Sequence, residues 1–562
     1  MVLEAASAFL GINAQPTAKA KIDPSQGRRR PIAPMIEKQA RATLPGIRAH
    51  ETESETLIGM FMTTELLGSS SRHATVIVAS FLAAVLALSL PLPEGLSEEA
   101  RRAAVFGAVM AVWWMSEAVP LQVTALLPIA AFPVAGVISL EAAASSYANP
   151  LIFLFLGGFL LAAAMQRWQL HWRLAVAVLA ISGPRPRNQV LAMMVGTAFL
   201  SLWISNTATT MVMVPIGLSL VAASRNHIAL RQADAPGAPS RAGEQEADGP
   251  FGAALMLGIA FAATIGGMVS LIGTPPNALL AGFVEQSYGV SIGFAQWMAL
   301  GVPIVLVLLP VTWLLLTRFV FQLPDEVSQA GKAPTAGEPM SPGQWRVAGV
   351  LVVTAAAWIL RPLISDTLGI RGLSDEGIAI TAALMLFLLP DRLSGGRPLL
   401  TWNEAKSIRW DVLILFGGGL ALADAIGSTG LAAWISSSAS TLSNWPVYLL
   451  VLVMMVLIVY LGELASNTAM AAIFLPIAGA TAIGLGMSPL TLLVPVALAA
   501  SLGFMLPVAT PPNAIVYGTG AVSARQMLRA GAALDVISIL IVFVMAMILG
   551  PLVFDLSATG AR

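Results

Sequence analysis

The sequence predicts an all-α, polytopic membrane protein with eleven transmembrane helices and two re-entrant helical hairpins arranged as an inverted repeat. Three observations predict this class. Hydrophobic residues make up 57% of the 562 residues and charged residues only 11%, against about 25% charged in soluble domains. Apolar runs of about 17–25 residues, each long enough to cross a bilayer, recur along most of the chain. The polar triplet Ser-Asn-Thr stands in the middle of two apolar segments, at 205–207 and 466–468.

The polar tail at 1–72 contains an Arg triplet and scattered prolines, so we expect it to be cytoplasmic and mostly disordered. The apolar runs after it predict the crossings. These lie near 74–92, 103–118, 121–137, 150–165, 251–285, 297–321, 346–361, 377–390, 410–426, 488–520 and 530–554.

Two further segments, 188–222 and 446–484, predict helical hairpins. Each is apolar at both ends, carries its triplet in the middle and is too long for one simple crossing. A hairpin that enters and leaves on the same side places the triplet near half depth. Non-helical backbone is tolerated there only where protein buries it or where it lines a wet cavity.

Loop charges predict the orientation. The connections at 138–149, 285–296 and 427–445 contain no Lys or Arg, whereas the opposite side is basic. Its basic residues are Arg167, Arg173, Arg185, Arg187, Arg225, Arg231, Arg392, Arg397, Lys406, Arg409, Arg525 and Arg529. The basic side should be cytoplasmic. The N-terminus is then inside, the first hairpin opens inward and the second opens outward.

The triplets belong to a longer internal repeat. Residues 152–165 resemble 412–425, and GTPPNA at 273–278 resembles ATPPNA at 509–514, in the same order around each triplet. An odd number of crossings separates equivalent points, so the halves are inverted. Inverted repeats with broken helices in corresponding positions indicate a secondary transporter whose site lies near the midplane.

The repeated motifs have a definite chemistry. Ser, Asn and Thr cap helices and form tight turns, so a hairpin tip built from them presents the free N–H groups of a new helix to an anion. The carbonyls released at the preceding helix end suit Na⁺. Two successive prolines break a helix, which predicts an unwound link before each Pro-Pro pair.

No Lys or Arg stands near these four breaks in the sequence. A bound anion must therefore be balanced by helix dipoles, hydroxyls, amides and co-bound cations.

Other chemistries have less support. The chain has no cysteine, and His50, His73, His171 and His227 fall in the tail or near predicted membrane edges. Formal net charge is zero and no basic block stands out, so we expect no nucleic-acid partner. Ionisable residues at depth are usually functional. Three ionisable residues, Glu117, Asp424 and Glu463, lie within the predicted membrane segments. We expect structural or gating roles for Glu117 and Glu463.

The motifs together resemble the divalent anion/sodium symporter family, the carriers of dicarboxylates, citrate and sulfate, over about residues 74–555. The stretches that carry the resemblance are WWMSEAVPLQVTALLP (113–128), LFLGGFLLAAAMQRW (154–168), WISNTATTMVMVPI (203–216), IGTPPNALLAG (272–282), ELASNTAMAAIFLPI (463–477) and PVATPPNAIVYGTG (507–520). The resemblance implies eleven crossings with two hairpins, a homodimer, and an elevator mechanism in which a transport domain slides against a fixed scaffold.

This division predicts the domains. They are a tail at 1–72, first scaffold helices at 73–149, a first transport region at 150–296 with the inward-opening hairpin 188–222, scaffold helices and a linker at 297–409, a second transport region at 410–529 with the outward-opening hairpin 446–484, and a last scaffold helix with the C-terminus at 530–562.

The resemblance also implies site residues. One sodium site would use Ser201, Ser205, Asn206 and Gly273, and the other Ala465, Asn467 and Ala509. The substrate carboxylates would meet Asn206, Thr207, Thr274, Ser466, Asn467, Thr468 and Pro511. One departure stands out, because symporters of this family often have a hydroxyl residue four positions before the second triplet, where this chain has Gly462.

These observations predict a secondary active transporter of C4-type dicarboxylates such as succinate, malate or fumarate, coupled to sodium ions and without an organic cofactor. A sodium-independent dicarboxylate exchanger and a tricarboxylate or sulfate carrier remain alternatives, and a channel or a membrane-embedded enzyme is less favoured. We expect an integral protein of the bacterial inner membrane, with its N-terminus in the cytoplasm. Its expected partners are the small anionic substrate, membrane lipid and a second copy in a homodimer.

Overall fold

The computed structural model of the chain describes residues 72–180, 182–233, 249–323, 339–370, 372–391, 396–439, 441 and 443–554, with the backbone alone at 225–233. The predicted disordered tail therefore lies outside the described residues, apart from its last residue. All elements below belong to one unit, residues 71–562.

The described residues form helices and connecting segments, with a single isolated β-bridge between Pro390 and Pro398. Nine helices among them are long and apolar enough to cross a membrane. The predicted all-α, polytopic class is confirmed. The helices are Arg72–Ser89, α4 Glu98–Ser116, α5 Leu121–Thr124, α6 Leu127–Ala131, α7 Leu140–Ser146, α8 Pro150–Arg167, α9 Leu170–Ala180, α10 Pro186–Ser201, α11 Asn206–Ala233, α12 Pro250–Gly267, α13 Pro275–Tyr288, α14 Phe294–Leu314 continued by the π-helix η1 Leu315–Val320, α15 Pro342–Leu368, α16 Asp375–Leu388, α17 Trp402–Ala405, α18 Trp410–Ser428, α19 Leu431–Ala439, α20 Val447–Gly462, α21 Asn467–Gly484, α22 Leu490–Ala500, α23 Pro511–Gly518 and α24 Ala524–Val553.

Helix starts follow local sequence rules. The side chains of Ser97, Ser139, Ser341, Ser374 and Ser523 each accept a hydrogen bond from an N–H of the first turn of α4, α7, α15, α16 and α24, which satisfies a donor that the helix leaves free. Proline begins α8, α10, α12, α13, α15 and α23, where its missing N–H costs nothing.

Both triplet segments are broken where the sequence predicts. In the first, α10 ends at Ser201 and α11 begins at Asn206, and Gly196 lies against Met213. These two residues are almost equally far from the break, so the helices run antiparallel as a hairpin. In the second, the break falls between α20 and α21, at 463–466. The membrane side toward which each hairpin opens stays a prediction.

The predicted crossings at 251–285 and 488–520 each consist of two half-helices. An unwound link at 268–274 separates α12 from α13, and one at 501–510 separates α22 from α23. Each second half-helix begins at the Pro-Pro pair, as the absence of two successive N–H groups requires.

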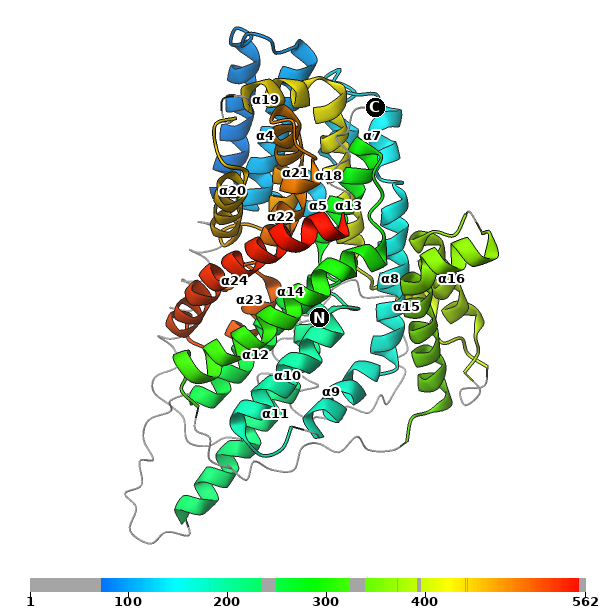
Figure 1. Cartoon of the computed structure of the whole chain (residues 1–562), viewed down its shortest axis with the longest axis vertical. Helices are drawn as coiled ribbons and strands as arrows, with labels where there is room; N and C mark the ends of the chain where they lie inside the picture. Colours follow the sequence, from blue (N-terminus) through cyan, green and yellow to red (C-terminus); the bar gives the residue numbers. More distant parts are fainter. Residues whose placement is uncertain are drawn as a thin grey trace, which may run out of the picture. The chain divides into compact units, whose positions relative to one another are not determined.

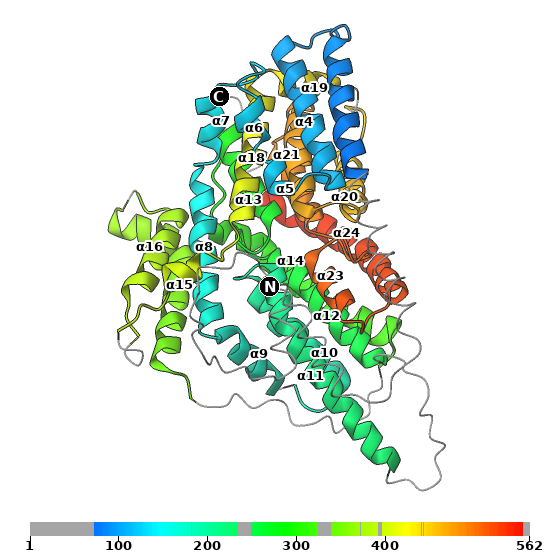
Figure 2. The same cartoon turned by 180° about the vertical axis from the view of Figure 1, so that it is seen from behind.

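The two halves pack across each other. The second helix of each hairpin contacts the Pro-Pro half-helix of the other half, α11 against α23 and α21 against α13. In both views α10 and α11 lie beside α12, and α14 lies beside α24 (Figures 1 and 2). This exchange brings the four breaks toward one place.

The predicted crossing at 121–137 is not a continuous helix. It contains the short helices α5 and α6 and a turn. Proline stands at 128 and 133, and each removes an N–H that a continuous helix would need. Apolar composition alone therefore overestimated the helix in this segment.

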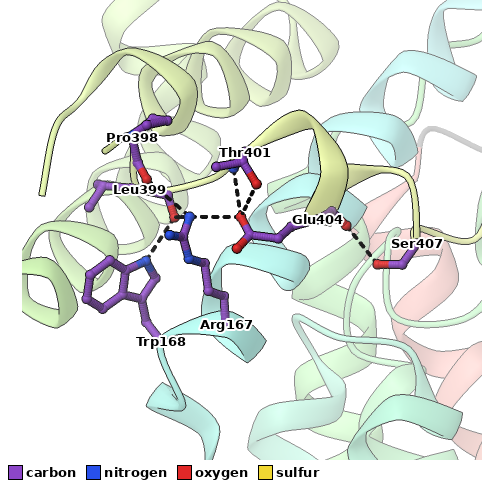
Figure 3. A network of polar contacts seen from close by, with 7 residues as sticks. All are labelled: Arg167, Trp168, Pro398, Leu399, Thr401, Glu404 and Ser407. Atoms are coloured by element: carbon purple, nitrogen blue, oxygen red, sulfur yellow. Dashed lines mark hydrogen bonds and ion pairs between the residues drawn. The ribbon is translucent and has the colours of Figure 1, made fainter. Parts of the chain in front are cut away.

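A polar network fixes the end of α8 (Figure 3). The Arg167 guanidinium donates to the Glu404 carboxylate at 2.8 Å and to the Leu399 carbonyl at 2.9 Å, and the Trp168 indole donates to the same carbonyl at 2.9 Å. The amide and hydroxyl of Thr401 donate to Glu404 at 2.8 and 2.7 Å. The network holds α8 against the segment that leads through α17 into α18. In the middle of α8, Gly157 packs closely against Ala379 of α16.

Candidate functional site

The four chain breaks line one cavity of about 720 Å³. Each hairpin tip contributes its Ser-Asn-Thr triplet, and each unwound link contributes the residues that lead into its Pro-Pro pair. The lining from these breaks is Ser205, Asn206, Thr207, Ile272, Gly273, Thr274, Pro275, Leu464, Ala465, Ser466, Asn467, Thr468, Val508, Ala509, Thr510, Pro511, Pro512 and Ala514. The helices α11 and α21 begin at this cavity, and the N–H groups of a first helical turn have no partner within their own helix.

The rest of the lining comes from α8, α18 and the region between α4 and α5. It contributes Phe155 and Phe159 together with the charged residues Glu117, Arg409 and Asp411. Arg409 corrects the expectation that no basic residue lies near the breaks. It precedes α18 in the sequence, far from every break, and the fold brings it to the cavity. Its guanidinium holds Asp411 in a two-pronged ion pair, with contacts of 2.8 and 2.9 Å.

An oxygen cluster lies behind the first triplet. The side-chain oxygen of Asn206 faces the Ser201 hydroxyl at 2.7 Å, the Ala263 carbonyl at 3.1 Å and the Gly273 carbonyl at 3.2 Å. Rotation of the amide by half a turn satisfies its hydrogen bonds, because its nitrogen then donates to all three oxygens. In both orientations the oxygens of Ser201, Ala263 and Gly273 converge on the Asn206 amide, and oxygen atoms are the ligands that a hard cation such as Na⁺ takes. Glycine is required at 267, because a Cβ there would collide with the Asn206 amide.

The second half has a corresponding cluster with fewer oxygen atoms. The Asn467 side-chain oxygen is buried and has no hydrogen-bond partner among the described residues. It lies beside Gly462 and Gly503. Gly462 occupies the position that corresponds to Ser201, so the hydroxyl that the first half supplies is missing. An unpaired buried carbonyl oxygen is costly, and a cation would satisfy it.

The asparagine of each Thr-Pro-Pro-Asn motif braces its unwound link. The Asn277 amide nitrogen donates to the Ser270 carbonyl at 2.9 Å and to the Met268 carbonyl at 3.2 Å. Asn513 donates to the Leu506 carbonyl at 3.0 Å and to the Gly503 carbonyl at 3.3 Å. Both side chains are fully buried. They satisfy carbonyls that unwinding has released.

The two hairpin tips are tied to the links by different groups. The Ser270 hydroxyl donates to the Leu202 carbonyl at 2.7 Å and accepts from the Gly273 amide at 3.0 Å. In the second half, the buried Glu463 carboxylate accepts from the amides of Phe504, Met505 and Leu506, at 2.7, 3.0 and 2.8 Å. The structural role expected for Glu463 is confirmed. Glu117, the other acid given such a role, is the C-cap of α4 with a φ of 49°.

Comparison with protein families decides the class of this site. The model described as "Sodium:sulfate symporter transmembrane region" matches residues 70–556. The chain belongs to this symporter family. The resemblance to the divalent anion/sodium symporters is confirmed, and the chain is a membrane transporter rather than an enzyme.

Relatives within the symporter family match over most of their length. A protein named sodium-dependent dicarboxylate transporter SdcS from Staphylococcus saprophyticus is 36% identical over 482 residues, which is 84% of this chain and 91% of that protein. The SdcS of Staphylococcus aureus strain USA300 is 37% identical over 454 residues, 80% of this chain and 85% of that protein.

Two solved structures share the fold. The YdaH transporter of Alcanivorax borkumensis matches with a TM-score of 0.51 and 15% identity, over 75% of this chain and 89% of that one. MtrF of Neisseria gonorrhoeae, described as illuminating a class of antimetabolite efflux pumps, matches with a TM-score of 0.51 and 13% identity, over 85% of this chain and 94% of that one.

The structure brings the sequence-predicted site residues together. All of them line the cavity except Ser201, which lies behind it and contacts Asn206. Sequence reasoning missed the bracing roles of Asn277, Asn513 and Ser270. The repetition of the motif asparagine in both halves was an available signal, whereas nothing in the sequence pointed to Ser270.

Proposed function

We propose that this protein is a secondary active transporter of C4-type dicarboxylates, such as succinate, malate and fumarate, and that it is coupled to Na⁺. The observation that carries this proposal is one cavity lined by two Ser-Asn-Thr triplets and two Pro-Pro links. The names of the SdcS relatives, sodium-dependent dicarboxylate transporters, support it.

The substrate site uses backbone and neutral side chains. The N-termini of α11 and α21 meet the cavity, where a helix dipole and free N–H groups favour a carboxylate. Two such ends in one cavity suit a ligand with a carboxylate at each end. The residues assigned to the substrate are Asn206, Thr207, Thr274, Ser466, Asn467, Thr468 and Pro511.

The sodium ions compensate the substrate charge. One site is assigned to Ser201, Ser205, Asn206 and Gly273, and the oxygen cluster around Asn206 supports it. The other is assigned to Ala465, Asn467 and Ala509, and the unpaired Asn467 oxygen supports it. Without bound cations, a dianion would face a cavity wall with two carboxylates and one guanidinium, which disfavours binding.

Transport follows an elevator mechanism in a homodimer, with both hairpins and both broken helices moving together against a scaffold. The exchange of contacts between the halves supports this, because α11 with α23 and α21 with α13 link the four breaks into one body. The protein lies in the bacterial inner membrane with its N-terminus in the cytoplasm.

Uptake of labelled succinate into proteoliposomes tests this function. We expect uptake against a concentration gradient with external Na⁺, and its loss when choline or K⁺ replaces Na⁺. Uptake that ignores Na⁺ and requires internal dicarboxylate would identify an exchanger. Preference for citrate or sulfate over succinate in competition would instead identify a tricarboxylate or sulfate carrier.

A further inference from the structure

The two hairpin tips differ in the side chain that stands two residues before the Ser-Asn-Thr triplet. In the second half this residue is Leu464, which lines the cavity and is 68% exposed. In the first half it is Trp203, between α10 and α11, which is partly buried and packs against the core. The first tip is therefore in contact with neighbours outside its own hairpin through a large aromatic side chain.

Two stacked contacts connect Trp203 to α15. The Trp203 ring stacks on Phe294, the first residue of α14, with the ring centroids 6.5 Å apart and 22° between the ring planes. Phe294 stacks in turn on Trp358 of α15, at 4.5 Å and 24°. Phe294 and Trp358 are fully buried. Because protein interiors are close-packed, these two rings restrict the positions that Trp203 can take.

One buried carboxylate holds both of these rings in place. The Asp375 carboxylate, at the start of α16, accepts a hydrogen bond from the Phe294 main-chain N–H at 2.9 Å. The Trp358 indole donates to the main-chain carbonyl of Asp375 at 2.9 Å. The Arg361 guanidinium pairs with the same carboxylate at 3.0 Å. Since a buried ion pair is costly to break, Asp375 fixes Phe294 and Trp358 relative to each other.

The same end of α14 also holds the first unwound link. The Trp297 indole donates to the Met268 carbonyl at 3.1 Å, and a Cβ at Gly301 would meet that carbonyl at 2.9 Å. In the second half, Gly531 brings α24 equally close to its own link, but Met527 stands four residues before it where the first half has Trp297. A methionine side chain has no N–H to donate, so this bond belongs to the first half alone.

We propose that Trp203 and Trp297 are positioning residues for the first sodium site, an inference that rests on the sodium-coupled function proposed above. Trp203 stands between Ser201 and Ser205 in the chain, so a shift of its backbone moves both of these assigned ligands. Trp297 holds the link that carries the third, Gly273. Neither tryptophan contacts the ion. They keep its oxygen ligands at a fixed separation, which lowers the cost of binding.

The test is uptake of labelled succinate by the full-length protein in proteoliposomes, measured against Na⁺ concentration. Trp203→Leu introduces the residue that the second half has, whereas Trp203→Phe keeps an aromatic ring. Trp297→Phe keeps the ring and removes the indole N–H. Trp345→Leu, at an exposed tryptophan of α15, is the matched control. Phe294→Leu, which removes the ring on which Trp203 stacks, replaces Trp203→Leu if the latter does not fold.

We expect Trp203→Leu and Trp297→Phe each to raise the Na⁺ concentration for half-maximal uptake about threefold or more, with Vmax at saturating Na⁺ changed less than about twofold. Trp203→Phe and Trp345→Leu should stay near the wild type. An unchanged Na⁺ dependence in either variant overturns the role of that tryptophan, and so does a loss confined to Vmax, which a purely structural role would give. Wild-type uptake that ignores Na⁺ would instead overturn the sodium coupling itself, and this proposal with it.

Discussion

The first and second halves of the chain hold their unwound links against the hairpin tips with different chemistry. In the first half, the neutral Ser270 hydroxyl bridges the two with bonds of 2.7 and 3.0 Å. In the second, the Glu463 carboxylate collects three backbone N–H groups. The bracing asparagines, Asn277 and Asn513, are the same in both. The repeat therefore preserves the geometry of the breaks while the groups that hold them have diverged.

The cation clusters differ in the same direction. Asn206 shares its cluster with the Ser201 hydroxyl, whereas Asn467 faces the bare backbone of Gly462. The second half thus has fewer side-chain oxygens for a sodium ion and more charge behind its link. This difference predicts unequal sodium affinities at the two proposed sites, and the following substitutions test that prediction.

The largest expected effect comes from the two triplet asparagines. Asn206→Ala and Asn467→Ala should each reduce sodium-driven uptake at least about a hundredfold, because each amide is assigned to both an ion and a substrate carboxylate. Uptake is measured in proteoliposomes, and the exposed Asn403→Ala serves as the control. Dimerisation and Tm should stay near the wild-type values. Normal uptake by either mutant would contradict the roles assigned to these residues.

The next effect compares Ser270 and Glu463, the two residues that connect a hairpin tip to its unwound link. Glu463→Ala leaves three backbone N–H groups without their charged acceptor, and bonds to charged groups contribute about 1.5–3 kcal/mol each. Ser270→Ala removes two neutral bonds of about 1 kcal/mol each. We expect Glu463→Ala to lower both Tm and uptake clearly more than Ser270→Ala, as measured by unfolding in detergent and by uptake. Equal losses would mean that the charge of Glu463 contributes nothing to the tie.

The contacts that connect the hairpin tips to the unwound links could not be predicted from the sequence. The breaks themselves were predictable because Pro-Pro pairs and Ser-Asn-Thr triplets act locally on the backbone. The partners of Glu463 lie 41–43 residues away. Their meeting depends on tertiary packing that no local pattern records. The continuous helix expected at 121–137 is absent for a local reason instead, because this apolar segment contains Pro128 and Pro133.

A smaller effect tests the difference between the ion clusters. Ser201→Ala should raise the Na⁺ concentration for half-maximal uptake about three- to tenfold, because one oxygen ligand is lost. Gly462→Ser should lower that concentration about twofold, since it restores a hydroxyl to the corresponding position. A Cβ at 462 would meet its nearest neighbour, Met470, at 3.7 Å, which leaves room for it. No change in Na⁺ dependence in either variant would show that the two positions lie outside the ion sites.

The smallest effect concerns the cavity wall. Arg409 lies on the cavity, yet its guanidinium is occupied by Asp411 and both side chains are more than 40% exposed, where an ion pair contributes about 0–1 kcal/mol. If the anion is held by helix ends and co-bound Na⁺, Arg409→Gln should change the KM for succinate less than about threefold. Lys406→Gln, on the neighbouring surface, is the control. A rise in KM of tenfold or more for Arg409→Gln alone would mean that a basic side chain binds the substrate, and the backbone would no longer be the main source of positive charge in this site.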